Sequence, residues 1–114
     1  MKLWFDPSDV FIGGRWQSPV EGRTLPLQDP STGAEIGQIA RGTAADIDAA
    51  VNAAEAALAG SWGQMTAVER GRIIARIGTL VLENAEALAL MEATDVGKPL
   101  SQARNDVIAL ARYM

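Results

Sequence analysis

The 114-residue chain contains neither cysteine nor histidine. Disulfides, thiolate nucleophiles, zinc sites of cysteine and histidine, and Ser/His/Asp catalytic sets are therefore excluded within this sequence. Basic residues number 10 against 14 acidic ones, which gives a net charge of −4 and no basic face. Nucleic acid is therefore not an expected partner.

Long apolar runs are also missing. No stretch approaches the roughly 20 residues of a membrane-spanning helix. The first ten residues lack the apolar core of a secretory signal. We therefore expect no membrane partner and a cytoplasmic location. The 48% of hydrophobic residues and 21% of charged ones are ordinary for one small globular domain.

Phosphate-binding glycine motifs do not occur either. The chain has no Gly-x-Gly-x-x-Gly, and Gly97-Lys98 is followed by Pro99 where a phosphate loop needs serine or threonine. The paired carboxylates Asp46/Asp48 and Glu83/Glu86 lie at helix starts, where capping is a commoner role than acid–base catalysis.

The first 42 residues have the pattern of short strands. Two β-favouring runs at 10–12 and 15–17 flank Gly13-Gly14, which predicts a hairpin with positive φ at both glycines. A second pair of strands is predicted at 24–28 and 35–40, joined by a turn at 29–33. Pro26 restricts the first of these strands to a sheet edge.

Residues 43–114 have the pattern of about four amphipathic helices. Thr43 with Asp46, and Thr66 with Glu69, are capping pairs for the first two, which end near Gly60 and Glu83. A short link is expected at 61–63. The third helix is expected to begin at Asn84 and end at Gly97, and the fourth to begin at Ser101.

Two groups of basic residues could be sites, but each has a simpler interpretation. Arg70, Arg72 and Arg76 are expected on a solvated helix face, because acidic residues share that helix. Lys98 would be a candidate nucleophile if it were buried, but a lysine in a turn beside glycine is usually solvated.

Residues 92–100 combine a helix end, a turn and a helix start. This stretch resembles the Glu-Thr-x-Asp-x-Gly-Lys-Pro signature of the aldehyde dehydrogenase superfamily, with Ala93 and Thr94 departing from its threonine position. Further pieces that resemble the family follow one another in the same order as in that family: residues 11–16, 29–36, 45–51, and Trp62 with Arg70.

The resemblance implies an α/β fold: a short β-hairpin and strands, then helices that pack on a Rossmann-like cofactor domain. Residues 1–114 would be the N-terminal part of that cofactor-binding domain, with strands and turns in 1–42 and helices in 43–114. The whole protein would oxidise an aldehyde to a carboxylic acid with NAD or NADP, as a homodimer or homotetramer. The family's catalytic cysteine, general-base glutamate and main cofactor contacts lie further along than residue 114, so no residue here receives those roles.

The resemblance implies one site within the chain, a monovalent-cation site that some members of the family have. It would use the backbone carbonyl of Gln28 and the carboxylate of Asp95. The alternative is that Asp95 only caps the turn near Gly97.

The helical pattern is still running at Met114, which we interpret as a sign of truncation. We therefore expect the segment alone to be inactive, to bind the cofactor weakly, and to be aggregation-prone or molten. The alternative function is a stand-alone helical module that binds a protein partner.

Overall fold

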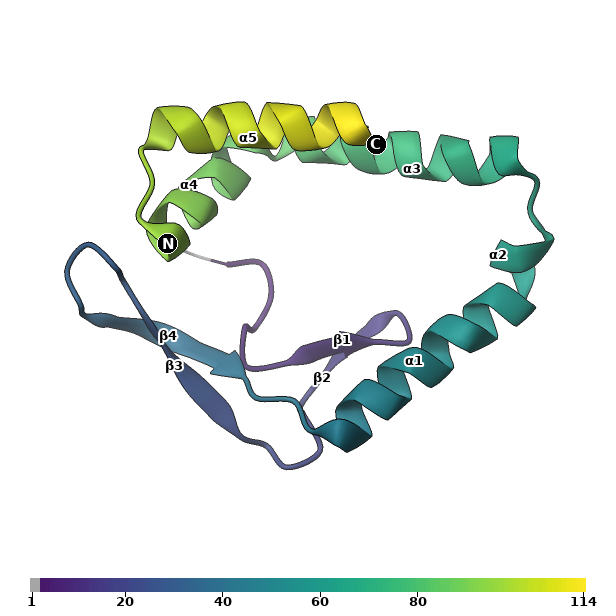
Figure 1. Cartoon of the computed structure of the whole chain (residues 1–114), viewed down its shortest axis with the longest axis horizontal. Helices are drawn as coiled ribbons and strands as arrows, with labels where there is room; N and C mark the ends of the chain where they lie inside the picture. The colour runs from purple at the N-terminus through teal and green to yellow at the C-terminus, as the bar shows by residue number, and fades with distance from the viewer. Residues whose placement is uncertain (1–2) are drawn as a thin grey trace. The chain divides into compact units, whose positions relative to one another are not determined.

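The computed structural model describes residues 3–114. Within these residues, four short strands precede five helices (Figure 1). The chain forms two compact units. The first contains the described residues up to Gln28 together with Glu35–Gln64, and the second contains Asp29–Ala34 and Met65–Met114.

The first unit begins with the predicted hairpin. Strand β1 (Val10–Ile12) pairs antiparallel with β2 (Arg15–Gln17). Gly13 and Gly14 have φ angles of 60° and 80°, as the two-residue turn requires. The prediction from Gly-Gly is therefore confirmed.

A second antiparallel pair follows in the same unit. Strand β3 (Thr24–Gln28) pairs with β4 (Glu35–Ala40), with an irregularity in register between Leu27 and Gln28. Each pair forms a sheet of two strands, so Pro26 lies in an edge strand as predicted.

Helix α1 (Ala44–Ala59) completes the unit with α2 (Ser61–Gln64). Thr43 and Asp46 form the predicted capping box at the start of α1. The predicted link at 61–63 is wrong, because these residues form the single turn of α2. Gly63 permits this turn: a Cβ there would collide with the Leu58 carbonyl oxygen.

The second unit is helical apart from the turn at 29–34. It contains α3 (Ala67–Glu83), α4 (Ala85–Val96) and α5 (Leu100–Tyr113), and α5 packs against both other helices (Figure 1). Its core is small: Ala89 and Ala103 are fully buried and Val107 is 3% exposed. Gly78 of α3 is buried as well, where α3 meets α5.

Asn84 occupies the predicted N-cap position of α4, but its side chain forms no capping hydrogen bond there. The side chain donates instead to the Leu80 carbonyl at 2.9 Å, at the end of α3. The predicted cap at Ser101 is wrong. Ser101 lies inside α5, because the Pro99 carbonyl already accepts from the N–H groups of Gln102 and Ala103. Asn84 and Ser101 both have side chains that can cap a helix. The Asn84 amide is bonded to the Leu80 carbonyl instead, and the helix at Ser101 has already begun at Pro99.

None of the helices formed by residues 3–114 is both long and apolar enough to cross a bilayer.

Candidate functional site at the corner between helices α4 and α5

The corner begins where α4 ends. Gly97 has a φ of 70° and donates its N–H to the Ala93 carbonyl at 3.0 Å, which closes the helix in a left-handed cap. Pro99 then starts α5. The predicted helix stop at Gly97 and Pro99 is therefore confirmed.

The turn of residues 29–33 lies against this corner. A Cβ placed on Gly97 would be 2.9 Å from Cγ of Pro30. The turn itself is held by Asp29, whose carboxylate accepts the Ser31 N–H at 2.7 Å, and by the Gly33 N–H, which donates to the Asp29 carbonyl at 2.8 Å. The Ser31 N–H is also the main reason that the pKa of Asp29 lies below its ordinary value.

Lys98 is not a free, solvated lysine, so the prediction from its turn position is wrong. Its Nζ donates to Glu92 of α4 at 2.5 Å and to Asp106 of α5 at 2.8 Å, and its side chain is 24% exposed. The bonds to Asp106 and Glu92 raise the pKa of Lys98. A cation held by two carboxylates is a poor nucleophile, so Lys98 ties α4 to α5 rather than performing chemistry.

A second ionic link joins the same two helices. Arg104 of α5 donates Nε and Nη2 to the Glu86 carboxylate of α4, with the shortest distance at 2.9 Å. The two residues are 18 positions apart, so no helical spacing pointed to the pair. The link assigns Glu86 a structural role rather than the acid–base role that its pairing with Glu83 left open.

Asp95, the residue of the predicted cation site, lies in the last turn of α4 and is exposed. Among residues 3–114 no donor forms a hydrogen bond or ion pair with its side chain. Gln28 is also exposed, at the end of β3, in the other compact unit. The pairing of Gln28 with Asp95 therefore stays a prediction. The described residues contain no group of three or more acidic side chains that could hold a metal ion.

The arginines predicted to be solvated divide into two sets. Arg72 and Arg76 are exposed, and Arg76 lies 3.4 Å from Glu83. Arg70 is half-buried and donates to the Met65 carbonyl at 2.7 Å. For Arg70 the solvated prediction is wrong, because its guanidinium closes the turn that precedes α3. The three side chains thus do not form an anion site.

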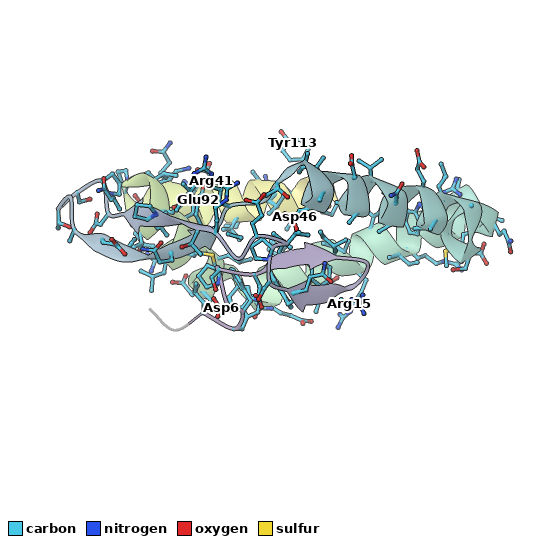
Figure 2. All side chains as sticks on the ribbon, turned by 90° about the horizontal axis from the view of Figure 1, so that it is seen from below. Asp6, Arg15, Arg41, Asp46, Glu92 and Tyr113 are labelled. Carbon is cyan, nitrogen blue, oxygen red and sulfur yellow. The ribbon has the colours of Figure 1, made fainter. Side chains whose placement is uncertain are left out.

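The N-termini of α1 and α3 offer no phosphate cradle. At the start of α1, the carboxylate of Asp46 (Figure 2) is 3% exposed and accepts N–H groups of Thr43 at 2.7 Å and Val20 at 2.9 Å. At the start of α3, Glu69 accepts the Thr66 N–H at 2.7 Å. These carboxylates already occupy the positive helix ends and would repel a phosphate. A dinucleotide therefore does not fit these two helix ends.

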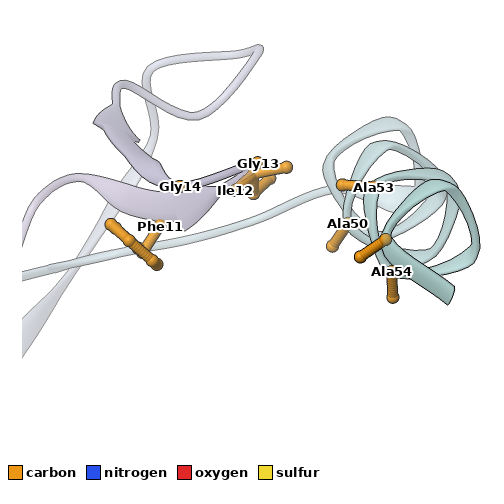
Figure 3. A pocket seen from close by; sticks show the side chains of 8 residues that line it. Phe11, Ile12, Gly13, Gly14, Ala50, Ala53 and Ala54 are labelled. Atoms are coloured by element: carbon orange, nitrogen blue, oxygen red, sulfur yellow. The ribbon is translucent and has the colours of Figure 1, made fainter. Parts of the chain in front are cut away.

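A shallow pocket in the first unit lies between the β1–β2 hairpin and α1 (Figure 3). Its volume is about 420 Å³, and it is lined by Phe11, Ile12, Gly13, Gly14, Ala50, Ala53, Ala54 and Ala57. None of these side chains is charged or carries a hydrogen-bonding group. The pocket therefore offers no side chain that could act as an acid, base or nucleophile.

The fold defines an α/β chain of short antiparallel strand pairs followed by helices, with ion pairs that join α4 to α5. The family model described as "Aldehyde dehydrogenase family" matches residues 16–114. The chain thus belongs to the aldehyde dehydrogenase family, as its motifs predicted.

Individual relatives agree with this assignment. An aldehyde dehydrogenase of Paracoccus denitrificans is 47% identical over 94 residues, which are 82% of this chain and 18% of that protein. The crystal structure of a putative aldehyde dehydrogenase from Burkholderia cenocepacia superposes with a TM-score of 0.89 at 52% identity, covering 90% of this chain and 22% of the other. A betaine aldehyde dehydrogenase from Staphylococcus aureus, solved with NAD+, gives a TM-score of 0.82 at 31% identity, covering 90% of this chain and 20% of the other. The chain spans about a fifth of the length of the relatives that it matches.

Proposed function

We propose that this chain is the N-terminal part of an NAD(P)-dependent aldehyde dehydrogenase that oxidises an aldehyde to a carboxylic acid. The observation that carries the proposal is the family match over residues 16–114, combined with its restriction to about a fifth of each relative. In this proposal the 114 residues are scaffold, and the segment by itself is inactive.

The chemistry of the reaction indicates which reacting groups these 114 residues lack. Oxidation of an aldehyde by a nicotinamide cofactor needs a nucleophile at the carbonyl carbon, a hydride acceptor and a base that activates water. In the family a cysteine is the nucleophile, and this sequence contains none. The nucleophile must therefore come from residues beyond these 114, as must most of the contacts to NAD or NADP.

The proposal includes the placement of the segment in the whole enzyme. Residues 1–114 belong to the cofactor-binding domain, with strands and turns in 1–42 and helices in 43–114. The whole enzyme is a homodimer or homotetramer in the cytoplasm. The small buried core of the second unit supports the view that these helices need further packing partners.

A monovalent cation bound by the Gln28 carbonyl and the Asp95 carboxylate is part of the same proposal. Asp95 supports it in two ways. Its carboxylate has no cationic partner among residues 3–114, and it lies at the end of α4 where the helix dipole is negative. A negative side chain at a negative helix end is stabilised by a bound cation.

The first test is the intact mass of the polypeptide as the source cell produces it. A mass several times 12.1 kDa supports the proposal, and the purified protein is then assayed with a panel of aldehydes and with NAD and NADP. A product of 12.1 kDa, or a long product that oxidises no aldehyde with either cofactor, contradicts it. Stoichiometric tight binding of NAD by the 114-residue segment would contradict the scaffold role.

A further inference from the structure

The segment that leads into β1 is attached to the hairpin by an aromatic stack. The Phe5 ring lies face to face with the Trp16 ring of β2, with centroids 4.9 Å apart and an interplanar angle of 8°. Phe11, which lies opposite Trp16 in the hairpin, approaches the same ring at 5.1 Å with an angle of 57°. Trp16 is therefore contacted once from the lead-in segment and once from its own hairpin.

Two residues further on, the same segment attaches to the other pair of strands. The Pro7 carbonyl accepts the Ala40 N–H at the end of β4, at 2.9 Å. The next amide, Arg41 N–H, donates instead to the Arg23 carbonyl at 2.8 Å. Pro7 thus covers the outer edge of β4 at Ala40, whose N–H would otherwise be an unpaired group on an exposed sheet edge.

The short connection between these two attachments is itself held in a fixed shape. The Asp6 carboxylate (Figure 2) accepts the Ser8 N–H at 2.9 Å and the Ser8 hydroxyl at 2.6 Å. Asp9, at the end of the segment, accepts the Ser18 hydroxyl at 3.3 Å. The Asp6 turn therefore fixes the backbone of residues 6–8, with Pro7 at its centre, and Phe5 directly precedes it. Because one residue separates the two attachments, displacement of one is expected to move the other.

We propose that residues 5–9 form a strap that opens and closes as one unit, with Phe5 seated on the β1–β2 hairpin and Pro7 seated on the edge of β4. Closing the strap joins the two hairpins and covers the β4 edge; opening it releases both together. The family match begins at Trp16, so the strap precedes it and supplements the proposed function without depending on it. Local opening of such a short segment, held by few contacts, requires much less free energy than global unfolding.

The test is residue-resolved hydrogen exchange on the intact polypeptide in which the chain is produced. Removing the stack with Phe5→Ala is expected to speed exchange of the Ala40 amide by about tenfold, because the lost stacking and burial favour the open strap. The Arg41 amide, which donates to Arg23 just beyond the end of the β3–β4 pair and not to the strap, is expected to change by less than about twofold. Phe5→Leu keeps apolar contact without the stack and is expected to give a smaller acceleration of Ala40.

Phe11→Ala is the matched control, because it also removes a ring from Trp16 but leaves the strap intact. In the Phe11→Ala variant, the Ala40 amide is expected to exchange at the wild-type rate. Equal acceleration of Ala40 by the Phe11 and Phe5 variants would overturn the proposal, since the effect would then come from the hairpin. An unchanged Ala40 rate in Phe5→Ala, or equal acceleration of Ala40 and Arg41, would overturn it as well.

Discussion

Gly97 and Pro30, which are 67 residues apart in the sequence, lie so close that a single methyl group on Gly97 would be 2.9 Å from the proline ring. Gly97 also has a φ of 70°, a conformation that costs other residues about 1–2 kcal/mol. Gly97→Ala therefore combines backbone strain with a collision against a rigid ring. We expect the free energy of unfolding to fall by about 2–3 kcal/mol, measured by urea denaturation.

Gly33→Ala separates the two contributions. Gly33 has a φ of 72°, but no atom lies within 4 Å of the position of its added Cβ. It should lose only the conformational part, about 1 kcal/mol. Removing the proline ring in the Pro30→Ala background should recover part of the Gly97→Ala loss. Equal losses at positions 97 and 33 would show that the contact with Pro30 contributes nothing.

Substitution by alanine at Gly78 and at Gly71 of α3 should change the stability of the protein in opposite directions. A Cβ on Gly78 would lie 2.9 Å from the Ala111 carbonyl oxygen and 3.2 Å from Met114 Cβ, whereas one on Gly71 meets nothing within 4 Å. Gly71→Ala should stabilise the protein by about 0.5–1 kcal/mol through helix propensity. Gly78→Ala should destabilise it by about 1–3 kcal/mol, because α3 and α5 must separate. Thermal melts of both variants test this, and stabilisation by Gly78→Ala would refute the close approach.

Local signals in the sequence predicted most of the secondary structure correctly. The Gly13-Gly14 turn, the Thr66/Glu69 capping box and the stop at Gly97 each depend on residues within a few positions of one another. Such features are determined by the backbone preferences and side-chain chemistry of a short stretch. Two of these local features also carried part of the resemblance to the aldehyde dehydrogenase family, since its motifs at 11–16 and 92–100 include the Gly13-Gly14 turn and the stop at Gly97.

Features that depend on distant residues were not predictable from the sequence. The sequence alone predicts a solvated Lys98, because Asp106 comes beside Lys98 only through the packing of α5 on α4. The close approach of Pro30 to Gly97 likewise follows from tertiary contact. The contact between α3 and α5 also falls on Gly78, which is buried, while the apolar Ile73 and Ile77 of α3 are 42% and 44% exposed. Hydrophobicity alone does not reveal where two helices touch through glycine.

Asp46 should make stability depend on pH in acid. Hydrogen bonds from the N–H groups of Thr43 and Val20 lower the pKa of Asp46 from its ordinary 3.8. A carboxylate with a lowered pKa stabilises the fold above its ordinary pKa, and this stability is lost as the pH falls through the folded value. Asp46→Asn should therefore be less stable than wild type at pH 7, and the difference should shrink below about pH 4. Urea midpoints at several pH values measure it.

Asp48→Asn is the control for this experiment, because Asp48 is exposed two residues further along α1. Its urea midpoint should match that of wild type at pH 7. A difference for Asp46→Asn that stays constant from pH 7 to pH 3 would mean that the lost stability comes from packing rather than from the charged carboxylate.

Lys98 should make stability depend on pH in alkali, with stability lost as the pH rises. Bonds to Asp106 and Glu92 raise the pKa of Lys98 above its ordinary 10.5. The stability from a group with a raised pKa is present below its ordinary value and is lost as the pH rises through the folded value. Lys98→Met should be less stable than wild type at neutral pH, and the difference should disappear only above pH 10.5. Arg76→Met should have little effect, since the Arg76–Glu83 pair is exposed at both ends.

Asp95 is the residue that tests the proposed monovalent cation. In the whole dehydrogenase, potassium chloride should raise the melting temperature more than choline chloride at the same ionic strength, because choline is too large for such a site. A cation at 100 times its dissociation constant stabilises a protein by about 2.7 kcal/mol. Asp95→Asn should remove the difference between the two salts, and thallium NMR should lose its bound signal. Asp48→Asn, an equal change of charge on an exposed helix position, should keep both effects. If Asp95→Asn retains the potassium-specific stabilisation, the Asp95 carboxylate does not bind the cation, and any bound cation lies elsewhere in the enzyme.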